Sequence, residues 1–225
     1  MIHAQQTQGF TGLGIAPKLF ELLTSMQFKT PTPIQQKAIP VALEGKDIVG
    51  IAQTGTGKTL AFGVPLIQRI MQTGSGVALV ILPTRELALQ VDEMLSRFAR
   101  AFGIQIAVLI GGAPMGPQIR SIKRSPRIIV GTPGRIIDHL DQRILRLNNV
   151  SMLVLDEADR MFDMGFAPQI SRILQAVPKE RQTMLFSATM PENILNIARA
   201  HMKLPVRVEI ARSGTPAAGV EHELF

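Results

Sequence analysis

The sequence predicts an α/β fold in which helices cover both faces of a mostly parallel β-sheet. Short apolar runs rich in β-branched residues alternate along the chain with longer segments of helical periodicity. The connections between these segments are short, as expected when each strand is followed by a crossover helix. Several apolar runs end in a polar or glycine-rich cluster, and open parallel sheets bind their ligands at the carboxyl ends of strands.

The elements can be assigned in chain order. The expected strands span residues 47–51, 77–82, 104–110, 127–130, 152–155, 182–186 and 206–210. The expected helices span 17–26, 33–44, 60–71, the stretch up to 102 that follows 83–88, 118–123, the stretch up to 140 that follows 131–135, 170–177 and 191–202. Ordered structure is expected to begin near Phe10. A length of 225 residues fits one α/β domain.

The most informative stretch is residues 47–59, where a buried strand runs into a Gly/Thr-rich turn and then a helix. In such a phosphate-binding loop, backbone N–H groups and the positive end of the helix face an anion. Lys58 adds a full charge, and the hydroxyl of Thr59 can bind Mg²⁺. Gly55 and Gly57 fit the motif, whereas its leading Gly is replaced by Ala52. A plain Gly-rich turn with an exposed Lys is the alternative.

Acidic residues follow another buried strand, in the sequence Asp156-Glu157-Ala158-Asp159. Asp156 is expected to hold Mg²⁺ together with Thr59 and the phosphates, in part through water. Glu157 is expected to orient or deprotonate the attacking water. The alternative is an acidic loop that caps the next helix. No grouping of Ser, His and Asp suggests a nucleophilic site, so phosphoryl transfer to water is the favoured chemistry.

Composition limits the remaining classes. The net charge is +7, from 24 basic and 17 acidic residues, which suggests a polyanionic partner. The absence of Cys excludes disulfides and thiolate metal sites. No apolar run is long enough to span a membrane, and no signal pattern is present, so we expect a soluble cytoplasmic protein. Arg120, Lys123, Arg124 and Arg127 form a basic cluster without an assigned role.

Taken together, these motifs resemble the first of the two RecA-like domains of DEAD-box ATP-dependent RNA helicases. The resemblance extends from Phe10 to about Ile210. Phe28 and the segment 31–35 are similar to the family's Q motif, which implies that Phe28 stacks near adenine and that Gln35 reads its edge. ATP is therefore the implied nucleotide. The implied nucleotide-binding residues are Phe28, Gln35, Gln53, Thr54, Gly55, Thr56, Gly57, Lys58 and Thr59, and the implied catalytic residues are Lys58, Asp156 and Glu157.

The resemblance also implies an RNA-binding surface and a coupling element. Segments after three strands match those that hold RNA through its sugar-phosphate backbone, without sequence specificity. The implied RNA-binding residues are Pro83, Thr84, Arg85, Gly112, Thr132, Gly134 and Arg135. Ser187-Ala188-Thr189 is similar to the motif that couples hydrolysis to strand separation, and Asp159 is expected to hydrogen-bond with it. From the residues alone, turn chemistry with solvated arginines is the alternative for each RNA segment.

The family's second RecA-like domain has no counterpart in this sequence. We expect residues 1–211 to form the ATP-binding domain with its N-terminal Q-motif extension, and residues 212–225 to form a linker and the start of that second domain. Alone, this part should bind nucleotide but hydrolyse ATP poorly, because the second domain supplies an arginine finger. The remaining alternatives are another P-loop ATPase and a non-catalytic nucleotide-binding module.

Overall fold

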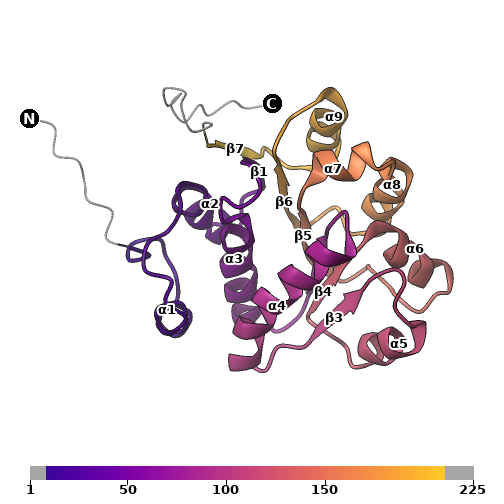
Figure 1. Ribbon diagram of the computed structural model, residues 1–225, viewed down its shortest axis with the longest axis horizontal. Helices are drawn as coiled ribbons and strands as arrows, with labels where there is room; N and C mark the ends of the chain where they lie inside the picture. Colours follow the sequence, from indigo (N-terminus) through magenta and orange to yellow (C-terminus); the bar gives the residue numbers. More distant parts are fainter. Residues whose placement is uncertain (1–8, 211–225) are drawn as a thin grey trace, which may run out of the picture.

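A computed structural model describes residues 9–210, which form a seven-stranded sheet flanked by helices (Figure 1). The strands are β1 (Ile48–Ile51), β2 (Val77–Ile81), β3 (Ile106–Leu109), β4 (Ile128–Gly131), β5 (Val150–Leu155), β6 (Gln182–Ser187) and β7 (Val206–Glu209). The helices are α1 (Pro17–Ser25), α2 (Pro33–Leu43), α3 (Lys58–Gln72), α4 (Arg85–Ala101), α5 (Met115–Lys123), α6 (Pro133–Asp141), α7 (Ala158–Asp163), α8 (Ala167–Ala176) and α9 (Glu192–His201).

The strands are arranged in the order β3-β4-β2-β5-β6-β1-β7, and each neighbouring pair within the described residues is parallel. Alternate residues of a strand enter two apolar cores, one on each face. Ile48 of β1 joins the core under α2, α3 and α4, whereas Val49 joins the core under α6, α7, α8 and α9. Figure 1 shows these two helix groups on opposite sides of the sheet. The predicted fold class is confirmed.

Strand order determines which loops meet at the carboxyl edge of the sheet. β5, β6 and β1 are neighbours, so the loops that begin at Asp156, Ala188 and Ala52 lie together. β3, β4 and β2 are neighbours in the other half, which groups the loops that begin at Ile110 and Thr132 with the loop after β2. The two halves meet where β2 pairs with β5. The phosphate-loop and acidic motifs therefore occupy one half, and the segments expected to bind RNA occupy the other.

A buried carboxylate joins three strands at the opposite, amino edge. Asp47 precedes β1 and accepts a 2.7 Å hydrogen bond from the backbone N–H of Thr183 and another of 2.7 Å from that of Lys203. Burial raises the pKa of the Asp47 carboxyl, although both backbone hydrogen bonds oppose this effect. Thr183 belongs to β6 and Lys203 precedes β7, so Asp47 fixes both neighbours of β1.

Element boundaries differ from the sequence prediction in several places. α7 was not expected at all, and α8 begins at Ala167 rather than at Ile170. α3 begins at Lys58, where the phosphate-loop motif was expected to run into a helix, because Gly57 adopts a left-handed conformation with φ of 92° that directs the chain into the helix. α5 begins at Met115 rather than at Gln118, since Pro117 is tolerated in the first turn of a helix. In the part of the chain that the structure describes, no helix is long and apolar enough to cross a membrane. The linker expected at residues 212–225 lies outside the described residues.

Candidate functional site

The phosphate loop joins β1 to α3 and is closed by its own side chains. Gly55 and Gly57 have φ of 83° and 92°, values that L-residues with a side chain rarely adopt. The Thr56 hydroxyl donates a 2.7 Å hydrogen bond to the carbonyl of Gln53. The side chains of Gln53 and Thr54 are exposed at the mouth of the loop, and Thr59 follows in the first turn of α3. The predicted loop residues are thus contiguous around the start of one helix.

Lys58 lies under the loop, with only 6% of the residue exposed. Its ammonium donates a 3.1 Å hydrogen bond to the carbonyl of Ala52 and lies 3.8 Å from Oδ1 of Asp156. The contact to Ala52 uses the backbone, so it does not require the Gly found in the strict motif. The ion pair joins the loop after β1 to the residue after β5 across the intervening strand β6.

Asp156 is a buried carboxylate at the end of β5, with 5% of the residue exposed. Burial raises the pKa of Asp156 to about 6, even though the charge of Lys58 acts in the opposite direction. Its Oδ1 also accepts a 2.9 Å hydrogen bond from the backbone N–H of Glu157. A buried anion beside a single ammonium is electrostatically suited to a further cation.

Glu157 is held in an unusual conformation, with φ of 54°, at the start of α7. The Thr54 hydroxyl donates a 3.1 Å hydrogen bond to Oε1 of Glu157, and Arg160 contacts Oε2 at 3.2 Å. The carboxylate is therefore fixed against the phosphate loop from one side and against α7 from the other. Sequence reasoning placed Thr54 and Glu157 in the site but missed Arg160, whose only signal was its position three residues after Glu157.

Gln35 connects α2 to the phosphate loop. Its Oε1 accepts a 2.9 Å hydrogen bond from the backbone N–H of Thr32, and its Nε2 donates a 3.0 Å hydrogen bond to the carbonyl of Gly57. Gln35 is buried, and the half-buried Phe28 packs against the apolar core under α2, α3 and α4. The second amide hydrogen and the second lone pair of the Gln35 side chain have no partner among the described residues. Gln35 thus retains one donor and one acceptor for a ligand.

Asp159 binds the Ser-Ala-Thr segment after β6, as the sequence predicted. Its Oδ2 accepts hydrogen bonds of 2.9 Å from both the backbone N–H and the hydroxyl of Thr189, and one of 3.2 Å from the N–H of Ala188. The backbone N–H of Asp159 donates a 3.1 Å hydrogen bond to the hydroxyl of Ser187. The start of α7 is therefore tied to the loop after β6.

The segments expected to bind RNA lie together in the other half of the carboxyl edge. Arg85 is exposed at the start of α4 and packs against Gly112, where a Cβ atom would collide with the guanidinium. Arg135 donates a 2.9 Å hydrogen bond to the carbonyl of Ala113 and pairs with Asp138 at 3.3 Å. The loops after β2, β3 and β4 are thus in mutual contact.

Three of these residues are less exposed than the sequence suggested. Pro83 is buried, and Thr132 is only 7% exposed, so its hydroxyl does not reach the surface as an open donor. Both residues end a strand and turn inward to start the next helix, which explains their burial. Thr84 is half-buried, and its hydroxyl caps α4 by accepting a hydrogen bond of 3.3 Å from the N–H of Leu87. Gly134 has open space around its Cα atom.

A buried polar pair that sequence reasoning missed supports these loops. Gln118 of α5 donates a 3.1 Å hydrogen bond to the carbonyl of Ile110, and its Oε1 lies 3.2 Å from Nε2 of His139 in α6. Burial, followed by the charge of Arg135, lowers the pKa of His139, so the neutral ring donates from Nε2. The pair fixes the loop after β3 relative to α6. The sequence did not indicate this pair, because the two polar residues lie 21 positions apart in two different amphipathic helices.

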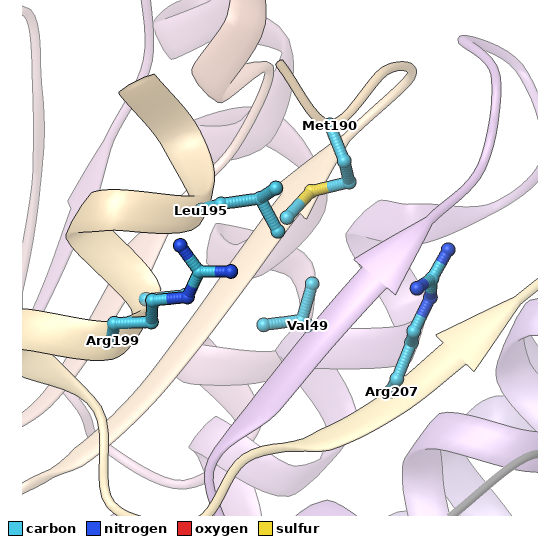
Figure 2. A pocket seen from close by; sticks show the side chains of 6 residues that line it. Val49, Met190, Leu195, Arg199 and Arg207 are labelled. Atoms are coloured by element: carbon cyan, nitrogen blue, oxygen red, sulfur yellow. The ribbon is translucent and has the colours of Figure 1, made fainter. Parts of the chain in front are cut away.

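The small cavity in Figure 2 is separate from this edge. It lies between β1, β7 and α9, and Val49, Met190 and Leu195 form its apolar wall. Its volume of about 10 Å³ holds about one water molecule, so it is a packing gap rather than a ligand site. Among the described residues, no cluster of three or more His, Asp or Glu side chains could hold a metal ion without other ligands.

Comparison with known proteins identifies the family. The DEAD/DEAH box helicase family model matches residues 32–197. The chain is 48% identical over 213 residues to the ATP-dependent RNA helicase CshA of Listeria monocytogenes serovar 1/2a, a match that covers 94% of this chain and 41% of that protein.

Two solved structures are similar in fold. A DEAD box protein from the hyperthermophile Methanococcus jannaschii is 39% identical with a TM-score of 0.85, and the match covers 89% of this chain and 55% of that one. A hypothetical ATP-dependent RNA helicase from Sulfolobus tokodaii is 36% identical with a TM-score of 0.80, covering 86% and 56%. The chain thus spans about half the length of these relatives. The motifs, the parallel sheet and these matches together show that the chain belongs to the DEAD/DEAH box helicase family.

Proposed function

We propose that this chain is the ATP-binding part of a DEAD-box RNA helicase, which couples ATP hydrolysis to local RNA strand separation or remodelling of RNA–protein complexes. The observation that carries the proposal is the meeting of Lys58, Asp156 and Glu157 at one sheet edge, with the Asp159–Thr189 contact beside them. The family match and the names of the relatives support RNA rather than DNA as the nucleic acid.

ATP would bind across the phosphate loop with its adenine toward α2. Phe28 would stack near the adenine, and the unused donor and acceptor of Gln35 would read its edge. The backbone N–H groups of the loop and the ammonium of Lys58 would hold the phosphates. Lys58 is already oriented by Ala52 and Asp156, so little reorganisation is required. The proposed ATP-contacting residues are Phe28, Gln35, Gln53, Thr54, Gly55, Thr56, Gly57, Lys58 and Thr59.

The donor set fits Mg²⁺, which in nucleotide sites takes one or two protein ligands together with phosphates and water. Asp156 supplies a buried carboxylate whose pKa of about 6 leaves it ionised at neutral pH, and Thr59 supplies a hydroxyl. Bound there, the ion would neutralise charge on the phosphates. Glu157 would accept a proton from the attacking water, because Thr54 and Arg160 hold its carboxylate beside the loop.

Coupling to RNA would begin at the contacts between the loops after β5 and β6, beside the phosphate loop. Asp159, Ser187 and Thr189 would transmit a change at the adjacent Glu157 to the loop after β6. The loops after β2, β3 and β4 would hold one RNA strand through its backbone, with Arg85 and Arg135 nearest to phosphate. Pro83 and Thr132 would contribute through their backbone only, because both are buried. The remaining contacts would come from Thr84, Gly112 and Gly134.

A second RecA-like domain would complete the enzyme. We propose that residues 1–211 form the first domain and residues 212–225 lead toward the second, which would supply an arginine to the transferring phosphoryl group. An arginine of this kind increases the rate by about 10³ to 10⁵ in related nucleotide hydrolases. The present chain would therefore bind nucleotide and hydrolyse it slowly.

The proposal is tested by calorimetric titration with ADP and then with GDP, both with Mg²⁺. We expect clear preference for ADP, which Gln35→Ala removes. The neighbouring Gln36→Ala is the matched control, because the side chain of Gln36 bonds to the carbonyl of Pro31 and not to the phosphate loop.

The ratio of the two affinities separates two roles of Gln35. Loss of adenine reading lowers the affinity for ADP toward that for GDP. Loss of the support to Gly57 lowers both affinities by the same factor. Equal binding of ADP and GDP by the unaltered chain would contradict the proposed ATP specificity.

A further inference from the structure

The described residues also form an open hollow, at the edge of the sheet opposite the site described above. A groove of about 430 Å³ lies among the loops that precede β2, β4 and β5. These three strands are neighbours in the sheet, so their amino ends form a continuous floor. The phosphate loop, the acidic motif and the RNA segments all follow the carboxyl ends of strands. A ligand in this groove would therefore leave the proposed catalytic edge free.

The walls of the groove combine apolar and cationic side chains. Ile122 of α5 and Ile144, in the loop after α6, are half-buried and line the hollow together with the buried Ile129 and Leu145. Arg146 is exposed at its rim. A hollow of this size, with an apolar floor and a few charged groups, has the features of a binding site for a small ligand or for a peptide side chain.

Arg127 forms a rigid wall of the groove. Its Nε donates a 2.7 Å hydrogen bond to the carbonyl of Gly76, and its Nη2 donates to the carbonyls of Thr73 at 3.0 Å and Ser75 at 3.1 Å. Neutral carbonyl groups orient the guanidinium without cancelling its charge. Arg127 therefore places a fixed positive charge at the groove.

The surroundings add further positive charge. Lys123, Arg124 and Arg143 are exposed and adjoin lining residues in sequence, and the exposed Arg120 lies two residues before the lining residue Ile122. Within residues 9–210, none of these four side chains, nor Arg146, forms an ion pair with a carboxylate. The nearby carboxylates are engaged elsewhere, since Asp138 pairs with Arg135 and Asp141 pairs with Arg172. Of the basic cluster left without a role by the sequence, Arg127 thus lines the hollow, and Lys123 and Arg124 lie next to its lining in sequence.

We propose that this groove binds an acidic peptide segment of a partner protein, with an aliphatic side chain of that segment inserted between Ile122 and Ile144. Carboxylates on both sides of the inserted side chain would meet the uncompensated cations, and such complementarity favours both encounter and register. RNA fits less well, because bases would need an aromatic platform and no Phe, Tyr or Trp lines the groove. The phosphate backbone would also gain nothing from the apolar floor.

The probe is a short fluorescein-labelled peptide with two adjacent leucines flanked by aspartates. We expect fluorescence anisotropy to show salt-dependent binding to the unaltered chain, with about tenfold weaker binding to Arg146→Glu. Ile144→Ser keeps every charge and should weaken binding about fivefold, through loss of apolar contact with the leucine. Arg97→Glu makes the same charge change on an exposed residue of α4 and should leave binding unchanged.

The outcomes that overturn the proposal are distinct. Equal binding of a peptide with serines in place of the leucines would show that the groove holds no apolar anchor. Unchanged affinity in both Arg146→Glu and Ile144→Ser would place the peptide elsewhere. If polyuridylate displaces the peptide from the unaltered chain, and Arg146→Glu abolishes the binding of polyuridylate, the groove is an RNA-binding surface. Each variant replaces an exposed or half-buried residue, and retained ADP binding would show that the variant is folded.

Discussion

Gly57 is the residue at which α2 and the phosphate loop meet. Its φ of 92° excludes most L-residues, and its carbonyl accepts a hydrogen bond from Gln35. A Cβ atom at Gly57 would collide with Nε2 of Gln35 and would lie 2.9 Å from Oγ1 of Thr32. Gly55 has a similar φ of 83° but open space around it. A residue with a Cβ atom would therefore meet the same backbone strain at both positions, but it would be crowded by neighbouring side chains only at Gly57.

This difference gives a matched pair of variants. Gly55→Ala should destabilise the fold by about 1–2 kcal/mol, the cost of a left-handed conformation for an L-residue. Gly57→Ala should cost roughly 3 kcal/mol or more, because crowding of Gln35 and Thr32 adds to that strain. Urea unfolding measures both. Equal free energies of unfolding for the two variants would show that the Gln35 contact does not constrain Gly57.

Asp159 provides a prediction about pH. Burial raises the pKa of its carboxyl, but hydrogen bonds from Thr189, Ser187 and Arg160 outweigh burial and hold the pKa below the ordinary 3.8. Because the pKa is lowered on folding, ionised Asp159 stabilises the folded state above pH 3.8. This contribution is lost as the pH falls through the folded-state pKa.

Asp159→Asn should therefore be less stable than the unaltered chain near neutral pH, and the gap should narrow below pH 3.8. Thermal unfolding at a series of pH values measures the gap. Asp163→Asn, in an exposed residue of the same helix, should show no such change. A stability difference between Asp159→Asn and the unaltered chain that stays constant as the pH falls well below 3.8 would contradict the stated role of the hydrogen bonds.

At this scale, the sequence predicted which residues gather at the carboxyl edge, and the contact between Asp159 and Thr189, but few of the other contacts. Lys58, Asp156 and Glu157 could be placed in the site because each follows a strand in a recognisable motif. The hydrogen bond between Thr54 and Glu157 joins residues that are far apart in the chain, and no local pattern encodes it. The burial of Pro83 and Thr132 likewise depends on packing against neighbouring elements.

Among the elements, β1 is held by a side chain outside its own hydrogen-bond ladder. Asp47→Ala would leave the backbone N–H groups of Thr183 and Lys203 without their acceptor. Each unsatisfied buried donor costs about 1–3 kcal/mol, so the two together predict a loss of about 2–6 kcal/mol in the free energy of unfolding. Chemical denaturation measures it, with the exposed Asp163→Ala as control. A loss below about 0.5 kcal/mol, typical of surface substitutions, would contradict this role.

Most helices were predictable from their apolar periodicity, and all the strands from short apolar runs rich in β-branched residues. α7 (Ala158–Asp163) escaped prediction because six residues are too few to show a helical period. The first turn of α5 was hidden by Gly116 and Pro117, which usually indicate a loop. These errors arise where the local sequence favours a loop but packing against the rest of the fold stabilises a helix.

For the whole molecule, the main prediction concerns the proposed second RecA-like domain. In a longer chain that contains the proposed second domain, Glu157→Gln should lower kcat by about 10² to 10⁴, because the proposed general base is lost while the phosphate contacts remain. ATP affinity should stay unchanged. Single-turnover hydrolysis and equilibrium binding measure the two effects.

The present chain supplies the converse experiment. It should show ADP binding with little RNA-stimulated hydrolysis, and robust turnover by these 225 residues would contradict the requirement for a second domain. The need for a parallel sheet was clear from the alternation of strands and helices. The order of the strands was not, since it depends on how the helices pack across the two faces.

That strand order has a consequence for biosynthesis. β1 pairs only with β6 and β7 in the described sheet, and Ile48 lies opposite Met184 and Val206. At about 5–20 residues per second, the ribosome needs on the order of ten seconds after making β1 to produce its first neighbour. During that interval the strand has two unpaired edges and no completed core. Newly made chains should therefore depend on chaperones until β6 has emerged, and should remain sensitive to proteases until then.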